Sequence, residues 1–187
     1  MPSLPDILDP VDPESDLAHG SVGLLERRVD ATSLRHVMGH FATGVAVVTA
    51  VDEHGEPVGT TVNAVTSVSL EPPLVLICLG LASATLRAVR ERAAFAINVL
   101  STEHGHLASG FALRGAMKPW RAARHRPGPT GTPRLEGVLA GLECTVEHRL
   151  PLGDHELVVG RVVAAEVGDE VERPLIFYRG AYSSLHR

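Results

Sequence analysis

The sequence predicts a mainly β domain, folded as a closed or partly closed barrel with a few short helices. From Val45 onward, most of the chain consists of short runs of β-branched and apolar residues separated by turn residues. Two long strands, Val138–Leu150 and His155–Val167, are joined by a short turn. The sequence shows neither strand–helix–strand alternation nor a repeat of about 20–50 residues, which argues against a parallel α/β sheet and a solenoid.

The chain divides into a tail, residues 1–29, and one domain, residues 30–187. The tail is acidic and contains four helix-breaking prolines: Pro2, Pro5, Pro10 and Pro13. A domain of this size can bury a sizeable core without disulfides. Its first element is a helix capped by Thr32 or Ser33 and continuing through Phe41, because apolar residues recur there at helical spacing.

Strands dominate the next part of the chain. The β-branched run Val45–Val51 forms a hairpin with Val58–Val62 through a turn at His54–Pro57. Ala64–Leu70 alternates valine and serine and is followed by two prolines. Leu74–Leu79 is a continuous apolar run, which predicts a strand buried on both faces.

The second half begins with a short amphipathic helix, Ala84–Ala93. The remaining elements are, in order, the strand Phe95–Leu100, a short helix capped by Ser101, a long loop over 113–133, the two long strands, a last strand Pro174–Tyr178 and a closing segment Gly180–Tyr182. Loops as long as 113–133 often serve as lids or partner surfaces.

Composition argues against several classes of protein. Lys and Arg number 17 against 22 Asp and Glu, a net charge of −5, which argues against a nucleic-acid binder. No apolar run reaches the ~18 residues of a membrane span. The N-terminus has no signal-peptide pattern, so we expect a cytoplasmic protein with no membrane association. The two cysteines, Cys78 and Cys144, lie in apolar runs and are expected to be buried and reduced.

Common catalytic motifs are missing from the sequence. It contains neither a serine-hydrolase nor a zinc-protease motif, and no phosphate-binding loop. It also lacks GxGxxG, which argues against a Rossmann dinucleotide site. Among ten histidines, His36 and His40 have the spacing of neighbours on one helix face. No third ligand is spaced to complete a set, so we expect no metal.

The most informative segment is Gly59–Pro73, which carries five hydroxyl side chains and one amide. Buried strands usually avoid so many polar groups, because each group must find a hydrogen-bond partner. One interpretation is that hydroxyls and backbone N–H groups of this segment bind a phosphate or the edge of a heterocycle. The other is an edge strand whose serines and threonines face water. The pattern alone leaves both interpretations open.

Several motifs, in a fixed order, resemble those of the flavin reductase-like family, whose members have an FMN-binding split β-barrel of Greek-key type. Any one motif is a weak signal, but their order over roughly residues 33–185 makes the resemblance specific. The matching segments are FATGVAVVT (41–49), GxTxNAxxSVSLEPPL (59–74), FAINVL (95–100), FA (111–112), LAxLEC (139–144), GDHxxVVGRV (153–162) and PLxFYRG (174–180).

The resemblance implies which residues bind a flavin. Those implied to line the flavin are Thr43, Gly44, Thr61, Val62, Asn63, Ala64, Ser67, Val68 and Ser69. Ala82 and Ser83 match a loop on the phosphate side of the cofactor. Phe111 belongs to the same set, and Arg114 is implied to pair with a phosphate.

The resemblance assigns His155 to the nicotinamide side of the site, with Tyr182 near the same face. Hydride transfer needs two stacked rings with the reacting atoms about 3–3.5 Å apart. A histidine beside the rings can donate a hydrogen bond to the nicotinamide amide, and backbone N–H groups of 63–69 can stabilise charge on the reduced flavin. Without the resemblance, His155 would be interpreted as a turn histidine between two long strands.

The implied function is that of the reductase component of a two-component monooxygenase. Such proteins are homodimers that reduce FMN or FAD with NADH or NADPH, and the reduced flavin diffuses to a partner oxygenase. Two alternatives are a tight flavin-binding electron-transfer protein and a non-catalytic binding module of the same barrel. Apolar runs such as Leu74–Leu79 and Val158–Val163 exceed what one small barrel can hide, which favours a dimer. Departures from the family pattern at Leu81-Ala82, at Met117–Trp120 and at His104 leave the flavin type open.

Overall fold

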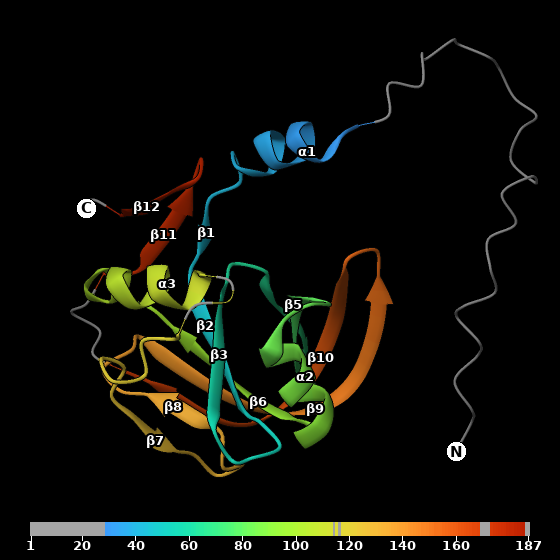
Figure 1. Cartoon of the computed structure of the whole chain (residues 1–187), viewed down its shortest axis with the longest axis vertical. Coiled ribbons are helices and arrows are strands. Elements are labelled where there is room, and N and C mark those ends of the chain that lie inside the picture. The colour runs from blue at the N-terminus through green and yellow to red at the C-terminus, as the bar shows by residue number, and fades with distance from the viewer. Residues whose placement is uncertain (1–28, 114, 116, 169–172, 186–187) are drawn as a thin grey trace, which may run out of the picture.

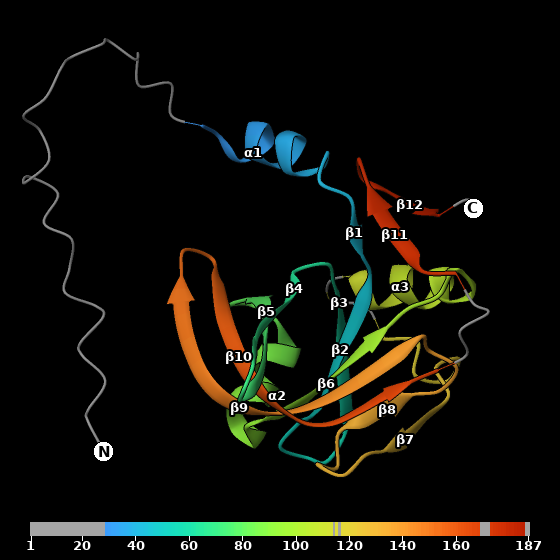
Figure 2. The same cartoon turned by 180° about the vertical axis from the view of Figure 1, so that it is seen from behind.

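The computed structural model describes residues 29–113, 115, 117–168 and 173–185 (Figures 1 and 2). The predicted tail therefore lies outside the described residues, apart from Val29. The described part is mainly β with a few short helices, which confirms the predicted fold class. None of its helices is long and apolar enough to cross a bilayer.

Most elements follow the order that the sequence predicts, but the short strands at 43–44, 125–127 and 133–135 are not among the predicted elements. The helices are α1 (Ala31–Met38), α2 (Ala84–Arg92), a short 3-10 helix η1 (Thr102–His104) and α3 (Gly105–Ala112). The strands are β1 (Thr43–Gly44), β2 (Ala46–Val51), β3 (Pro57–Val62), β4 (Val65–Leu70), β5 (Pro73–Gly80), β6 (Ala94–Val99), β7 (His125–Pro127), β8 (Pro133–Leu135), β9 (Ala140–Leu152), β10 (His155–Val167), β11 (Leu175–Tyr178) and β12 (Ala181–Ser184).

Seven of these strands form one antiparallel sheet in the order β3-β2-β6-β9-β10-β5-β4. Its two edge strands, β3 and β4, follow each other in the chain with only Asn63 and Ala64 between them. The sheet must therefore curl until its edges approach each other at this connection, and Figure 1 shows the strands wrapped around a common interior. No ladder joins β3 to β4 among the described strands, so the barrel stays split along this seam.

A smaller sheet, β1-β11-β12, extends from one end of the barrel. β1 precedes β2 with one residue between them, so the small sheet is attached directly to a barrel strand. α1 precedes β1, and Figures 1 and 2 both show it outside the barrel. None of the α1 residues is buried.

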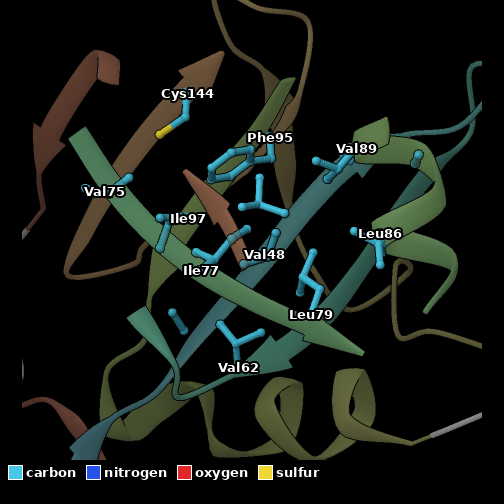
Figure 3. Packing of buried hydrophobic residues seen from close by; sticks show 14 residues of the cluster. Val48, Val62, Val75, Ile77, Leu79, Leu86, Val89, Phe95, Ile97 and Cys144 are labelled. Carbon is cyan, nitrogen blue, oxygen red and sulfur yellow. The ribbon is translucent and has the colours of Figure 1, made fainter. Parts of the chain in front are cut away.

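Two hydrophobic clusters form the core. The first fills the barrel, where side chains from β2, β5 and β6 meet and α2 contributes Leu86 and Val89 (Figure 3). The second lies around α3 and includes Leu107, Phe111 and Leu135. Burying a side chain of this size contributes about 1.5–3 kcal/mol, so the clusters hold the strands that carry the site.

Three local expectations are corrected by the structure. α1 begins at Ala31, because the Asp30 carboxylate accepts a hydrogen bond from Ser33 N–H at 2.7 Å and so caps the helix. The helix ends at Met38, before Phe41, with Gly39 as its C-cap. Ser101 does not cap its helix; its hydroxyl bonds His104 Nδ1 at 2.8 Å instead. The predicted loop over 113–133 contains β7, which pairs with β8.

The expectation of a strand buried on both faces at Leu74–Leu79 is also wrong. Along β5, Val75, Ile77 and Leu79 are buried in the barrel, whereas Leu74, Leu76 and Cys78 are only half-buried. The strand has one face inside the barrel and one outside, so successive side chains alternate between the two faces. Half of this apolar run is left on the outer surface of the chain.

Candidate functional site

The Gly153–Asp154–His155 turn lies at one end of the barrel sheet, where β9 passes into β10. His155 is the first residue of β10 and pairs with Gly80, the last residue of β5. A Cβ on Gly80 would lie 3.8 Å from His155 Nε2, so the imidazole lies over the glycine. The Leu81 N–H donates to the Asp154 carbonyl at 3.0 Å. The turn is therefore held against the loop that leads from β5 to α2.

Asp154 determines which ring nitrogen of His155 carries the proton. Its carboxylate lies 2.7 Å from Nδ1. This hydrogen bond is the main cause that lowers the pKa of the Asp154 carboxyl, the charge interaction with His155 is the next, and the positive charge of Arg35 on α1 adds a smaller part. An ionised carboxylate can only accept hydrogen bonds, so Nδ1 is the donor. When only Nδ1 carries a proton, Nε2 is a hydrogen-bond acceptor.

An apolar strip runs from His155 across the outer faces of β5 and β10. The register pairs Cys78 with Leu157 and Leu76 with Val159, and all four side chains are half-buried. Burial, and next the negative charge of Asp154, raise the pKa of the Cys78 thiol. Cys78 thus stays protonated and contributes an apolar surface. Strips of this kind can support a flat ring system.

The polar segment that the sequence singled out lies beside this strip. Ala64 is linked to β5 because its carbonyl accepts a hydrogen bond from Cys78 N–H at 3.3 Å. Asn63 and Ala64 are exposed at the seam of the barrel, and Ser67 and Val68 are exposed on the edge strand β4. The register between β4 and β5 shifts between Ser67 and Ser69, which is a β-bulge at Val68.

Three of the proposed flavin contacts have structural roles in the chain itself. The Thr61 hydroxyl donates to the Ala108 carbonyl at 2.6 Å and ties β3 to α3. Val62 is buried in the barrel core. Ser83 is the N-cap of α2, and its hydroxyl accepts from Leu86 N–H at 3.4 Å. Ala82, immediately before Ser83, is exposed.

Thr43, Gly44 and Tyr182 lie in the small sheet. Thr43 pairs with Phe177, which pairs in turn with Tyr182, and the Phe177 and Tyr182 rings are 5.8 Å apart. The Thr43 hydroxyl is buried and has no hydrogen-bond partner among the described residues. Such an unpartnered hydroxyl costs free energy unless a ligand satisfies it.

Phe111 is not placed on an open surface. Its ring is fully buried in the second core cluster, with its centroid 4.9 Å from that of Trp120. A Cβ on Gly59 would lie 3.1 Å from the Phe111 ring, so Gly59 lets α3 pack closely on β3. Arg114 lies outside the described residues.

The structure thus brings together His155, Ala82, Ala64 and the β4 edge around an apolar strip. Leu76, Cys78 and Leu157 were missed by sequence reasoning, because an unbroken apolar run hides its own alternation. One cavity of about 220 Å³ lies between the β2–β3 turn and α2, and another of about 170 Å³ lies between that turn and β7. Neither includes a predicted cofactor residue. Asn63, Ala64 and Ala82 are exposed, so in the single chain the candidate site is an open surface beside the seam.

Comparison with known families decides the identity of this fold. The model of the flavin reductase-like domain matches residues 38–186, most of the chain. The chain belongs to the flavin reductase-like family. The match includes the seam at Asn63 and Ala64 and the turn at His155, so the site described above lies within the domain that defines the family.

Similar proteins share this assignment. A probable flavin reductase of Rhizobium meliloti is 42% identical over 73% of this flavin reductase-like chain, which spans only 44% of that relative's length. The reductase component of 4-nitrophenol 4-monooxygenase/4-nitrocatechol 2-monooxygenase of Rhodococcus opacus is 41% identical, with 82% of this chain and 80% of the relative covered. The crystal structure of the Streptomyces globisporus NADH:FAD oxidoreductase SgcE6, with NAD and FAD fragments, superposes with a TM-score of 0.78 and 34% identity, covering 84% of this chain and 93% of the other.

The residues of this flavin reductase-like protein fit a flavin. A flat, half-buried apolar strip lies between Ala64 and His155, and hydroxyls line the neighbouring β4 edge. Thr43, whose buried hydroxyl has no partner among the described residues, lies in the small sheet and not in the sheet that carries this strip. Isoalloxazine and nicotinamide rings have apolar faces and polar edges, so the strip and the β4 hydroxyls suit both.

Proposed function

We propose that this protein is an NAD(P)H:flavin oxidoreductase that reduces FMN or FAD by hydride transfer and supplies the reduced flavin to a partner monooxygenase. The observation that carries the proposal is the row of residues that joins Ala64 to His155 through Cys78 and Leu157. It provides a ring-sized apolar surface with a histidine at one end. The names of the curated relatives support the same activity.

The flavin and the nicotinamide carry the hydride chemistry themselves when they are bound. The protein therefore needs to stack them, orient them and keep water away. The strip formed by Leu76, Cys78 and Leu157 supplies the apolar contact for stacking. Asn63, Ala64 and the β4 edge supply hydroxyl and backbone groups for the polar rim of the flavin.

His155 orients the nicotinamide through Nε2. Because Asp154 holds a proton on Nδ1, Nε2 of His155 accepts a hydrogen bond from the NH₂ group of the nicotinamide amide when Nε2 carries no proton. This refines the sequence-based expectation, in which the histidine donates. Asp154 is then a positioning residue, since it acts on the nicotinamide only through the imidazole.

A homodimer is part of the proposal. α1 exposes an apolar face, and the outer strip of β5 and β10 is only half-covered in the single chain. A second subunit over these surfaces would bury them and enclose the open site, because ligand sites often form at such boundaries. Two free thiols, Cys78 and Cys144, are typical of a reducing compartment and support a cytoplasmic location.

Oxidation of NADH, followed at 340 nm with and without added FMN or FAD, tests this function. We expect flavin-dependent oxidation by the wild type and, in His155→Ala, a kcat/KM for NADH lower by about tenfold or more. His54→Ala is the matched control, because His54 lies exposed in the β2–β3 turn away from the strip. It should keep full activity.

Three outcomes separate the alternatives. No oxidation with either flavin and either nicotinamide would overturn the proposal and leave a binding protein. A purified protein that is yellow and passes electrons only to another protein would indicate an electron carrier. Full activity in His155→Ala would keep the reductase and return His155 to a structural role in the turn.

A further inference from the structure

Glu156, the residue after His155, is a buried carboxylate. Its side chain is 3% exposed and points to the opposite side of β10 from His155, as alternation requires. Arg90 of α2 donates from Nε to both carboxylate oxygens, at 3.3 and 3.2 Å, and from Nη2 to Oε2. Arg149 of β9 lies 4.0 Å from Oε1. This ion pair joins α2 to the strand that begins at His155.

A second link joins the same two parts of the chain. The loop 81–83 leads from β5 into α2, and the Leu81 N–H donates to the Asp154 carbonyl at 3.0 Å. Ser83 caps α2 at the end of this loop. The loop, the helix and the turn therefore form a closed ring of contacts, with Arg90 and Glu156 on one side and Leu81 and Asp154 on the other.

We propose that the Arg90–Glu156 pair is a positioning device for cofactor binding, which fixes the separation between His155 and the loop 81–83. This inference rests on the proposed function, in which His155 contacts the nicotinamide, and on the family resemblance, which implies that Ala82 lies on the phosphate side of the cofactor. Arg90 and Glu156 touch neither cofactor. They act because a shift of α2 would move the loop and the turn relative to each other.

The charges of Arg90 and Glu156 determine how the effect of substituting Arg90 depends on pH. Hydrogen bonding by the Arg90 guanidinium lowers the pKa of the Glu156 carboxyl, against the raising effect of burial. Arg149 is the other charged residue that faces Glu156. The residues that pair with Glu156 on the neighbouring strands, Leu79 and Pro151, carry no charge. In the wild type Glu156 is therefore ionised at every pH above its ordinary value, and its state adds no pH dependence near neutrality.

Replacing Arg90 should change this behaviour. In Arg90→Gln the lowering contact is lost while burial remains, so the pKa of Glu156 rises. At low pH the carboxyl is neutral and tolerates burial. As the pH rises through the raised pKa, a buried charge forms whose remaining partner is Arg149 at 4.0 Å, and this poorly compensated charge displaces the strand. We expect the KM for NADH of Arg90→Gln to exceed that of the wild type by about tenfold at pH 8 and by much less at pH 5.5, with a smaller change in kcat.

The double variant Arg90→Gln/Glu156→Gln removes the charge and should restore a pH-independent KM near that of the wild type, because two amides can bond each other. Arg124→Gln is the matched control, since it breaks an exposed ion pair with Glu136 beside β7 and should change nothing. A KM for NADH of Arg90→Gln that equals the wild-type value at both pH values would overturn the proposal.

Amide hydrogen exchange provides a measurement that does not need activity. In Arg90→Gln at pH 8, exchange at the Leu81 amide should be faster than in the wild type by about tenfold, relative to the amides of β11. If Arg90→Gln folds poorly, Arg90→Lys takes its place. Because lysine keeps the charge, its Leu81 exchange should be faster than in the wild type by less than tenfold. Unchanged Leu81 exchange would refute the device, whereas faster exchange in a protein that oxidises no NADH would refute only the proposed function.

Discussion

Gly160 illustrates how one residue on β10 limits the shape of the barrel. A Cβ at this position would lie 2.5 Å from Phe95 Cζ and 2.8 Å from Cys144 Cβ. Both neighbours are fully buried, so neither can move away freely. The register of β10 on β9 also shifts next to Gly160, between Val159 and Gly160. Because Gly160 has no side chain, the Phe95 ring can occupy the space next to β10 in the core.

Gly160→Ala should therefore destabilise the protein by about 1–3 kcal/mol, the usual range for overpacking a core. Urea unfolding followed by circular dichroism measures the difference. Gly105→Ala is the control, because nothing lies within 4 Å of its added methyl group at the start of α3, and it should be neutral or stabilising by up to ~1 kcal/mol. Equal stabilities of Gly160→Ala and wild type would show that the core can expand at this point.

At the scale of elements, the β7–β8 hairpin is held by a buried carboxylate. Glu143 of β9 is fully buried and accepts hydrogen bonds from Thr130 N–H at 2.9 Å and from the Thr130 hydroxyl at 2.7 Å. Arg134 Nε lies 3.4 Å from its other oxygen. Gly128 leaves the room for this carboxylate, since a Cβ there would overlap Glu143 Oε1. The segment that the sequence predicts as one long loop is thus anchored to the barrel.

Glu143→Ala should destabilise the protein by about 1–3 kcal/mol, because it removes the buried acceptor of the two Thr130 hydrogen bonds, while Arg134 keeps its ion pair with Glu166. Limited trypsin digestion should cut first at Arg121 or Arg124, next to the released hairpin. Glu147 lies on β9 like Glu143, and Glu147→Ala removes only an exposed ion pair with Arg161 of β10, so it should leave the unfolding midpoint and the digestion pattern nearly unchanged. The same digestion pattern in Glu143→Ala and wild type would contradict this role.

At the scale of the whole molecule, the apolar face of α1 is not covered by any other part of the described chain. This face, Leu34, Val37 and Met38 together with Phe41, is 55–68% exposed, and no residue of the helix is buried. Figure 2 shows the helix standing clear of the barrel. A stable dimer needs about 800 Å² of covered surface on each subunit. This helix and the outer strip of β5 and β10 are the surfaces that a second copy would cover.

Light scattering should therefore give a mass of two 19.9 kDa chains for the wild type. Val37→Asp places a charge in the apolar face of α1 and should shift the protein toward monomer at micromolar concentration, with loss of flavin-dependent activity if the site needs both subunits. Met117→Asp adds the same charge at a residue that is 97% exposed beyond α3 and should remain dimeric. A monomeric wild type would remove the dimer from the proposal.

Much of the fold follows from local patterns. Alternation and turn residues placed the strands to within one or two residues, since hairpins such as β2–β3 and β9–β10 depend on neighbouring residues in the chain. The bounds of α1 and the short strands β1, β7 and β8 were missed, because a cap at Asp30 and pairing between distant segments depend on particular contacts. The family was identified from the order of its motifs, which the family match over 38–186 confirms.

The sequence by itself determined the fold class, the family and most element positions, because these depend on periodicity and on motif order. It also pointed to His155 and to Asn63–Ser69. Only the tertiary structure decided which side of β5 faces outward. All residues of the run Leu74–Leu79 are apolar, so the sequence does not distinguish the side chains inside the barrel from those outside it. The tertiary structure alone paired Glu156 with Arg90 and Glu143 with Thr130, because residues separated by 66 and 13 positions meet only when the sheet curls. Long-range contacts of this kind depend on the whole barrel, and no local pattern encodes them.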